Sequence, residues 1–482
     1  MNNFYSIIRI LERVSYWRVW LMIFTYSLIF GLFFQFFILP TIFFKMHAGN
    51  GLIIGGDWVG YHEIAKNLAY SINSEGWQLW ELRPYGQSAA GIAAVIYALT
   101  VSKPFVLLPI YSAIMASSAL ILIRISEELV KNRFAAIVSI IPFVIFPSNI
   151  AIYDQIGKDA FYFLGAYFCL YSWILVFLND NQKNKYLIAI IFMIIGSFLM
   201  WTVRNYSIII LKNMLYLLIV LNIILFIINL IRKNSISSQI SGTIVLIISS
   251  IILSFYTLDK SDPRGSLEVN VGTSAEVGTS AQSSVKFSIP EASNVDWHGL
   301  VFARDNWKKS DWLPSKIDNA LLNIAILRNG YIVDFTQRSQ IYKNTGSMID
   351  LEVHLTSALE FVKYAPRALQ VAFLAPFPSD WVRDLKSAHG QRGMQGVIAA
   401  EMLFSYLFLL MFPIAIYSFW KNPFFYVTVF FSMIMLMLYA YATPNIGTLY
   451  RLRYGFIVPI ISISLGCAVS KFINKYKIKV IN

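Results

Sequence analysis

The sequence predicts an all-α polytopic membrane protein with about ten transmembrane helices, interfacial helices in its first outer loop and one large external loop. Three observations predict this fold class. Of the 482 residues, 57% are hydrophobic and only 13% are charged, whereas a soluble protein carries about 25% charged residues. Apolar runs recur along the chain, and each is near the roughly 20 residues needed to cross a bilayer. Basic residues collect beside every second run, as they do in cytoplasmic loops.

The spans follow the apolar runs, and basic residues set their direction. Arg9, Arg13 and Arg18 precede the first run, and Lys471 and Lys475 follow the last, which predicts that both termini are cytoplasmic. The first run is too long for a signal-peptide core and lacks a small-residue cleavage site, so we expect it to be retained. The predicted spans are about 19–44, 104–126, 134–152, 160–178, 186–201, 208–230, 240–257, 397–419, 424–442 and 455–470.

The chain divides into three predicted parts. Residues 1–257 form an N-terminal transmembrane module with juxtamembrane helices at about 58–102, residues 258–396 form an external, periplasmic region, and residues 397–482 form the last helices and a basic cytoplasmic tail. The external region contains 15 basic and 15 acidic residues, so the net charge of +13 lies among the spans and short loops. This distribution is typical of membrane topology and argues against a nucleic-acid partner. A short duplication at 271–281 is typical of a mobile linker.

The sequence indicates no bound cofactor. Cys169 and Cys467 both fall inside predicted spans, which favours neither a disulfide framework nor a zinc site. His47 and His62 flank Asp57 without metal-ligand spacing, so a divalent cation is the less favoured alternative. The chain has no P-loop, no dinucleotide glycine fingerprint and no HExxH pattern. An activated substrate would therefore have to supply the energy of any reaction.

The first outer loop contains the most informative stretch, which begins at Gly55 directly after the first span. Apolar residues then recur at helical spacing, which predicts an amphipathic helix in the membrane interface. They are Trp58, Tyr61, Ala65, Leu68 and Ile72. A second apolar segment, about 88–102, is too short to span and reads as juxtamembrane. Asp57 stands at the N-cap position of the first helix, so its carboxylate is either a structural cap or a catalytic group.

The second outer loop supplies further charged candidates on the same membrane face. Asp154, Lys158 and Asp159 follow the third predicted span. Asp159 either caps the fourth span or joins Asp57 in a site, and Lys158 stands beside it.

Three arginines stand on the outer side, where positive charge is disfavoured. Arg204 ends the fifth predicted span, and Arg451 and Arg453 precede the last. Guanidinium groups bind phosphate oxygens in a planar, bidentate way, so the three indicate a phosphate pocket. Glu401, about one turn inside the eighth span, is expected to pair with one of them.

This arrangement resembles the GT-C superfamily of integral membrane glycosyltransferases. The resemblance is to bacterial members similar to protein O-mannosyltransferases and to the aminoarabinose transferases of lipid A. It rests on a first span, an outer loop with an aspartate, and the interfacial Tyr61-His62-x-x-Ala65 pattern that follows.

Two further features fit the resemblance, and one departs from it. A carboxylate follows the third span, as Asp154 or Asp159, and Arg451-x-Arg453 precedes the final helix. The family's first-loop aspartate is commonly followed by a second acidic residue, whereas Trp58 stands here. A role that needs two adjacent carboxylates in that loop is therefore in doubt.

The resemblance implies transfer of a sugar from a polyprenyl-phosphate donor to a glycan, lipid or protein acceptor on the outer face. Asp57 would be the general base, with Asp159 as a second catalytic carboxylate. The lipid phosphate would be held by Arg204, Arg451 and Arg453. The remaining site candidates are Tyr61, His62, Asp154 and Lys158.

Two alternatives stay open at this point. An O-antigen or similar polysaccharide polymerase also has about ten helices and a large external loop, but uses a diphosphate-linked donor. A lipid-linked sugar flippase is less favoured, because the ionisable residues lie at the ends of spans rather than at mid-membrane. The absence of a retention signal favours a bacterial inner (plasma) membrane.

Overall fold

The helices account for all regular structure in the described part of the chain. The computed structural model describes residues 11–54, 56–178, 184–232, 237–256, 303–342, 348–381 and 392–481. Within these ranges β-structure occurs only as isolated bridges. The duplication at 271–281 lies outside them.

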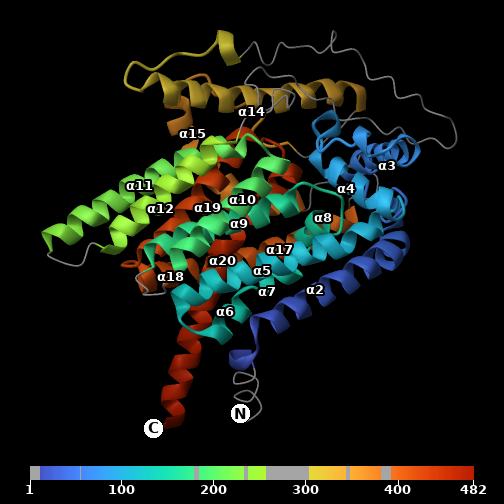
Figure 1. The fold of residues 1–482 in the computed structure, drawn as a ribbon. Coiled ribbons are helices and arrows are strands. Elements are labelled where there is room, and N and C mark those ends of the chain that lie inside the picture. The colour runs from blue at the N-terminus through green and yellow to red at the C-terminus, as the bar shows by residue number, and fades with distance from the viewer. Residues whose placement is uncertain are drawn as a thin grey trace.

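Long helices build the body of the molecule, and shorter ones connect or cover it (Figure 1). The long helices are α2 (Tyr16–Phe33), α5 (Leu108–Val130), α9 (Asp159–Phe177), α10 (Lys185–Val203), α11 (Ser207–Ile231), α12 (Ser237–Ser254), α14 (Ser315–Tyr342), α17 (Arg392–Leu409), α19 (Pro423–Ala442) and α20 (Ile446–Ile481). The others are α3 (Trp58–Glu75), α4 (Ser88–Leu99), α6 (Arg133–Ser139), α7 (Ile141–Ile145), α8 (Ser148–Tyr153), α15 (Ala358–Leu374), α16 (Pro378–Trp381) and α18 (Phe412–Phe419).

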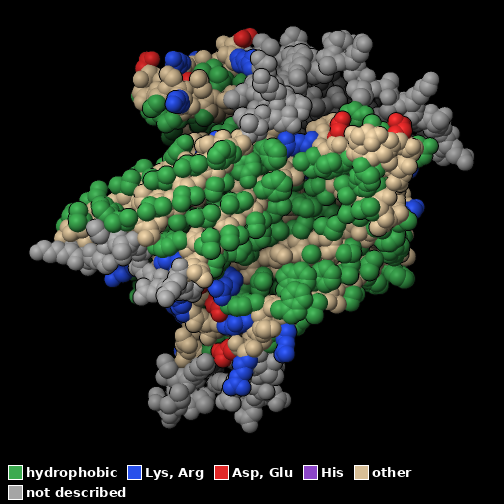
Figure 2. All heavy atoms as spheres, in the orientation of Figure 1, with side chains coloured by type: hydrophobic (Ala, Val, Ile, Leu, Met, Phe, Trp, Pro, Cys, Tyr) green, Lys and Arg blue, Asp and Glu red, His purple; other side chains and the backbone are tan. Residues whose placement is uncertain are grey.

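The protein is an all-α multi-pass membrane protein. Eight helical stretches of the described ranges are long and apolar enough to cross a membrane. They are Tyr16–Ile42, Pro104–Val130, Asp159–Phe177, Lys185–Val203, Ser207–Ile231, Gln395–Phe419, Pro423–Ala442 and Ile446–Lys475. Figure 2 shows hydrophobic side chains covering the flank of the bundle as a broad band, with charged side chains gathered toward its two ends. This is the surface that a lipid bilayer requires.

The third and seventh predicted spans account for the difference from the expected count of ten. The third, 134–152, is broken into α6, α7 and α8. Pro142 lies at the start of α7 and Pro147 directly before α8, and proline cannot continue a helix because it lacks the amide donor. In the seventh, the apolar stretch Gln239–Ser254 is shorter than a full span.

The last helix begins earlier than the sequence indicated. We expected a span at about 455–470 with the two arginines in the loop before it, whereas α20 begins at Ile446. The Asn445 side chain accepts the amide of Thr448 at 2.9 Å, the hydrogen bond that favours a helix start. Arg451 and Arg453 therefore lie inside a helix, on different faces.

The start of α2 and the end of α20 lie at one end of the bundle (Figure 1). Helices α3, α4, α14 and α15 lie at the opposite end, which we call the distal end. The described parts of the predicted external region thus form a layer across the distal end, the distal layer. Which side of the membrane this end faces stays a prediction from the charge distribution.

Helix α9 is the centre of the bundle. Of its apolar window, 89% is buried by protein, against 22% for α11 and 17% for Gln395–Phe419. Its sequence is apolar on all sides, as befits a helix surrounded by other helices. Asp159, at the distal tip of α9, is thereby held at a fixed point.

Two facing glycines bring α9 and α10 close together. A methyl group added at Gly196 would stand 2.7 Å from the carbonyl oxygen of Gly165, and one at Gly165 would stand 2.7 Å from that of Gly196. Small residues at such crossings let membrane helices approach closely.

We expect Gly196→Ala to destabilise the protein by about 1–3 kcal/mol, because helix backbone cannot yield to the added methyl without separating α9 from α10. Thermal unfolding in detergent measures the change. Gly60→Ala in α3 is the matched control, since the added methyl there meets nothing within 4 Å. An unchanged unfolding temperature for Gly196→Ala would contradict the packing described.

Candidate active site

Asp57 lies at the start of α3, on a loop that is fixed to the loop between α8 and α9. The Ile53 amide donates to Gln155 Oε1 at 3.0 Å, and the Trp58 indole donates to the Ile53 carbonyl. The Asp57 carbonyl accepts the Tyr61 amide at 2.9 Å, but its carboxylate makes no capping hydrogen bond. The structural cap that we considered for this carboxylate is therefore wrong. The Asp57 side chain is 52% exposed.

Asp159 is buried between two arginines from distant parts of the chain. Its Oδ1 lies 2.5 Å from Arg204 Nη2, and its Oδ2 lies 2.7 Å from Arg451 Nε. Arg204 stands where α10 ends, and Arg451 lies in the second turn of α20. A buried carboxylate is tolerated when both oxygens are paired in this way. Asp159 thus joins three helices at one point.

Arg451 also connects this buried pair to Asp57. Its Nη2 lies 3.6 Å from Asp57 Oδ2, and its guanidinium lies 6.0 Å from the Trp58 ring. We call Asp57, Arg451, Asp159 and Arg204 the distal charge array. Positive and negative charges alternate along it, and its exposed end is Asp57.

The buried end of the array is enclosed by tyrosines. Arg204 donates to the Tyr206 hydroxyl at 2.9 Å, and its guanidinium lies 5.1 Å from the Tyr162 ring. Burial alone would lower the pKa of Arg204, but Tyr206 and Asp159 raise that pKa well above its usual value. Arg204 is therefore charged at every physiological pH.

Lys158 and Tyr61 border the array. The Lys158 ammonium donates to the Gly86 carbonyl at 3.2 Å and lies 5.9 Å from the Tyr61 ring. Lys158 also precedes Asp159 in the chain and acts on it electrostatically. Both predicted candidates thus lie beside the predicted catalytic carboxylates.

His62 points away from the array. It is buried between α3 and α4, with Nδ1 2.9 Å from the Tyr97 hydroxyl. Burial lowers the pKa of its imidazole, so the neutral ring packs in the interior of the distal end.

Asp154 is also separate from the array, because it is buried against α2. Its backbone carbonyl accepts from Gln35 at 2.7 Å and from Gln155 at 3.0 Å. Its carboxylate crowds Gly31, where an added methyl would stand 2.9 Å from Oδ1. Burial raises the pKa of Asp154 well above its usual value.

Arg453 and Glu401 form a second buried polar region. Arg453 follows Arg451 by two residues, a rotation of about 200° around a helix, and is buried on another face of α20. It donates to the Phe373 carbonyl at 3.0 Å and to the Met402 sulfur. Glu401 accepts hydrogen bonds from Ser148, at 2.8 Å from its amide and 2.6 Å from its hydroxyl. The expected arginine partner is Arg453, whose charge acts on Glu401 electrostatically.

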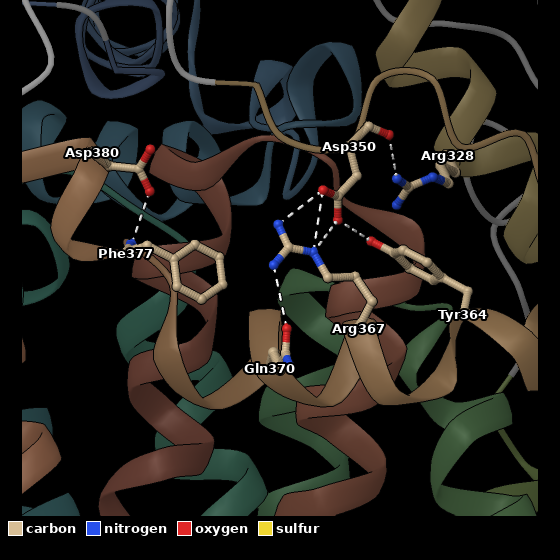
Figure 3. Close-up of polar contacts among 7 residues, drawn as sticks. All are labelled: Arg328, Asp350, Tyr364, Arg367, Gln370, Phe377 and Asp380. Atoms are coloured by element: carbon tan, nitrogen blue, oxygen red, sulfur yellow. Dashed lines mark hydrogen bonds and ion pairs between the residues drawn. The ribbon is translucent and has the colours of Figure 1, made fainter.

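A charged cluster lies within the distal layer and includes Arg328, Asp350 and Arg367 (Figure 3). Arg328 of α14 is fully buried and donates to the carbonyls of Asp350, Val353 and Tyr441, at 2.8, 3.1 and 3.3 Å. The Asp350 carboxylate accepts from Arg367 at 3.0 Å. Tyr441 ends α19 just before α20, so the layer is held against the turn that leads to Arg451.

The backbone beside this cluster makes the same connection. The Ile349 amide donates to the Pro444 carbonyl at 2.9 Å. On α15, Phe361 accepts from the Tyr441 hydroxyl at 2.8 Å. The distal layer is therefore joined to the end of α19 and to the turn before α20 by both side-chain and backbone hydrogen bonds.

Sequence reasoning missed Arg83, which helps to position the distal charge array. Arg83 donates to the carbonyls of Trp201 and Thr202, at 2.7 and 3.2 Å, and its guanidinium lies 4.5 Å from the Trp201 ring. These carbonyls lie in the last turn of α10, two and three residues before Arg204, so Arg83 fixes the first loop to the helix end that presents Arg204. The Arg83-Pro84 pair before an apolar segment was its only sequence signal.

A metal centre finds no support in the ranges that the structure describes, which contain no group of three or more His, Cys, Asp or Glu side chains able to hold an ion. A cofactor-free reaction stays a prediction.

The fold and the array together define a class: a multi-pass membrane protein with a charged site at the distal end of its bundle. Comparison with protein-family models, curated proteins and solved structures finds no match to this chain. The resemblance to the GT-C superfamily therefore stays an expectation from its short motifs.

The raised pKa of Asp154 predicts a pH-dependent stability. The folded protein keeps this proton at pH values where the unfolded chain has released it, so the contribution is full below the unfolded pKa and is lost as pH rises through the folded pKa. Asparagine does not titrate and fits the same space. We expect Asp154→Asn to gain stability relative to wild type as pH rises from the unfolded-state pKa, about 4, toward the raised folded-state pKa, by up to about 1.4 kcal/mol per pH unit.

Thermal unfolding in detergent across this pH range measures the difference. The control for removing one carboxylate is Glu63→Gln, at an exposed position of α3. A difference between Asp154→Asn and wild type that is constant with pH would contradict a buried, protonated Asp154.

Proposed function

We propose that this protein is a membrane glycosyltransferase that moves a sugar from a polyprenyl-phosphate donor to a glycan, lipid or protein acceptor at the distal, outer face. The distal charge array carries this proposal. The exposed Asp57 carboxylate lies 3.6 Å from the Arg451 guanidinium. Arg451 is in turn held by the buried carboxylate of Asp159. A base next to a phosphate-binding group, at the edge of a hydrophobic band, suits chemistry on a lipid-borne phosphate.

The two carboxylates have different environments, which supports different roles. Asp57 is half exposed and is not used as a cap, so it can receive a proton. Asp159 is buried with both oxygens engaged by arginines. In this proposal Asp57 is the general base, and Asp159 positions Arg204 and Arg451 rather than exchanging protons.

The phosphate would be held by Arg451, with Arg204 and Lys158 adding positive charge behind it. Counting Asp159, this part of the site has an excess of positive charge that favours a departing phosphate monoester. Arg453 is not part of this set, because its contacts are with Phe373 and Met402. Its role is to hold α15 against α20.

The proposed reaction is one displacement at the anomeric carbon. The acceptor hydroxyl gives its proton to Asp57 while its oxygen forms a bond to the anomeric carbon. The bond from that carbon to the phosphate oxygen breaks, and the polyprenyl phosphate leaves with the electron pair. A single displacement inverts the configuration at the anomeric carbon.

A groove on the flank of the bundle supports a lipid-linked donor. Its volume is about 390 Å³ and its lining is apolar, from α5, α9 and α10: Pro109, Ile110, Ala113, Ile114, Ser117, Phe161, Leu164 and Leu199. Phe161 lies two residues after Asp159, and Leu199 lies five residues before Arg204. An isoprenoid chain in this groove would have its phosphate end near the array.

We expect Asp57→Asn to lower kcat by about 100- to 10,000-fold with the fold intact, because the amide cannot accept the proton. Purified protein in detergent is incubated with a panel of undecaprenyl-phosphate hexoses and pentoses, and glycosidic product is counted. Glu63→Gln, the same chemical change further along α3, should keep full activity. Full activity in Asp57→Asn would rule out Asp57 as the base.

The groove makes a separate prediction. Ala113→Phe should fill it and raise KM for an undecaprenyl-phosphate donor about tenfold, while a donor with a short, two-isoprene chain keeps its KM. The control is Leu120→Phe, two turns further along the same face of α5 and outside the groove. Equal effects on long and short donors would show that the groove does not bind the chain.

The same assay separates this proposal from a polysaccharide polymerase. A polymerase requires a diphosphate-linked donor and extends a chain by repeats, whereas a transferase adds one sugar to each acceptor. Deletion in the source organism distinguishes them as well, since loss of a polymerase leaves single repeat units and loss of a side-branch transferase preserves chain length.

A further inference from the structure

The turn between α3 and α4 contains a backbone conformation that its side chain does not favour. Tyr85 has φ +50° and ψ +33°, the left-handed region. Glycine and, less often, asparagine or aspartate occupy this region, whereas a bulky aromatic residue there is an outlier that indicates strain. The next residue, Gly86, also has a positive φ, +75°, so the turn places two consecutive residues there and only the second is a glycine.

The surrounding structure forces this conformation on Tyr85. Arg83 is bound to the end of α10 through two carbonyls. Pro84 is buried. The Gly86 carbonyl accepts a hydrogen bond from the Lys158 ammonium at 3.2 Å. Upstream, the Trp80 indole donates to the Gly91 carbonyl at 3.0 Å. A strained residue persists only where its neighbours fix the chain in this manner.

Burial of the ring does not offset the strain. The Tyr85 side chain is 74% exposed, so the fold gains little apolar contact from an aromatic residue at this position. Backbone strain that does not improve packing is found mostly at functional sites.

The two anchors of the turn lie beside the distal charge array. Arg83 binds the carbonyls of Trp201 and Thr202, three and two residues before Arg204. Lys158, which holds Gly86, directly precedes Asp159 and lies 5.9 Å from the Tyr61 ring. The turn is therefore fixed on one side to the segment that carries Arg204 and on the other to the segment that carries Asp159. From this turn Tyr85 presents an exposed aromatic ring.

An aromatic ring offers a large rigid apolar face with a polar tip. A sugar ring has a matching pair of faces, one of which often presents a row of C–H groups. We propose that Tyr85 stacks against the sugar ring that enters the distal site and is a substrate-binding residue. This inference rests on the proposed glycosyl transfer. The ring is either the donor's or the acceptor's, and both have the same stacking chemistry.

The test uses a substitution that separates strain from stacking. Asparagine adopts the left-handed region readily and adds no freedom to the unfolded chain as glycine would. Tyr85→Asn should therefore raise the thermal unfolding temperature while lowering kcat/KM about tenfold, the loss of one aromatic stacking contact. Tyr85→Phe, which keeps the ring, should retain activity within twofold.

The matched control is Tyr70→Asn on α3, where the tyrosine is 75% exposed within an ordinary helix. It should keep kcat/KM near that of wild type. Transfer is measured with the undecaprenyl-phosphate hexose that the wild-type protein uses, with donor and acceptor varied in turn. A raised KM for one of them identifies whose ring Tyr85 covers.

Each outcome decides the matter. No transfer by the wild-type protein with any donor overturns the proposed function, and this inference with it. A wild-type enzyme whose Tyr85→Asn variant has unchanged KM and kcat overturns the stacking role alone. The stacking role is also overturned if Tyr70→Asn loses as much activity, since exposed aromatics would then serve the membrane interface in general. It is likewise overturned if Tyr85→Phe is as impaired as Tyr85→Asn. A lower unfolding temperature for Tyr85→Asn would show that the backbone of Tyr85 is not strained and would overturn the inference.

Discussion

The buried contact of Asp159 with Arg204 and Arg451 is the interaction on which the rest of the distal end depends. A carboxylate within a protein interior at the edge of a membrane is costly unless its charge is balanced. Here each oxygen faces a different arginine, at 2.5 and 2.7 Å. Helices α9, α10 and α20 must therefore end or begin at the same level of the bundle, and that level is where Asp57 reaches Arg451.

Two further arginines extend this constraint to the rest of the distal end. Arg83 fixes the first loop to the end of α10, and Arg328 fixes the distal layer to the turn before α20. Both use main-chain carbonyls as hydrogen-bond acceptors, and these include carbonyls at the ends of α10 and α19. The net result is a network of hydrogen bonds around the exposed carboxylate of Asp57, which suits the proposed general base because its direction is set before a substrate arrives.

The sequence was informative where a property is local. The apolar runs predicted the multi-pass class and most spans, because hydrophobic length is read directly from consecutive residues. It was less informative where a helix begins: α20 starts at Ile446 because Asn445 caps it, and that shift alone turns Arg453 away from Arg451. Pairings between distant residues, such as Glu401 with Ser148, leave no local pattern. The charge rule did single out Arg204 and Arg451 as exceptions, and the structure places both beside Asp159. The strained Tyr85 has no sequence signature, because its conformation is imposed by contacts on either side.

The central position of α9 also has a consequence for the order in which the protein assembles during synthesis. Ribosomes deliver the chain from its N-terminus, so α9 enters the membrane with a carboxylate at its tip and no partner yet made. Arg204 follows 45 residues later, but Arg451 comes from the last helix of the chain. Until α20 inserts, one oxygen of Asp159 has no cation and Asp57 has no guanidinium beside it. A chain cut short before its final helix would thus lack Arg451 and leave both Asp57 and one oxygen of Asp159 without their shared cation at the distal end.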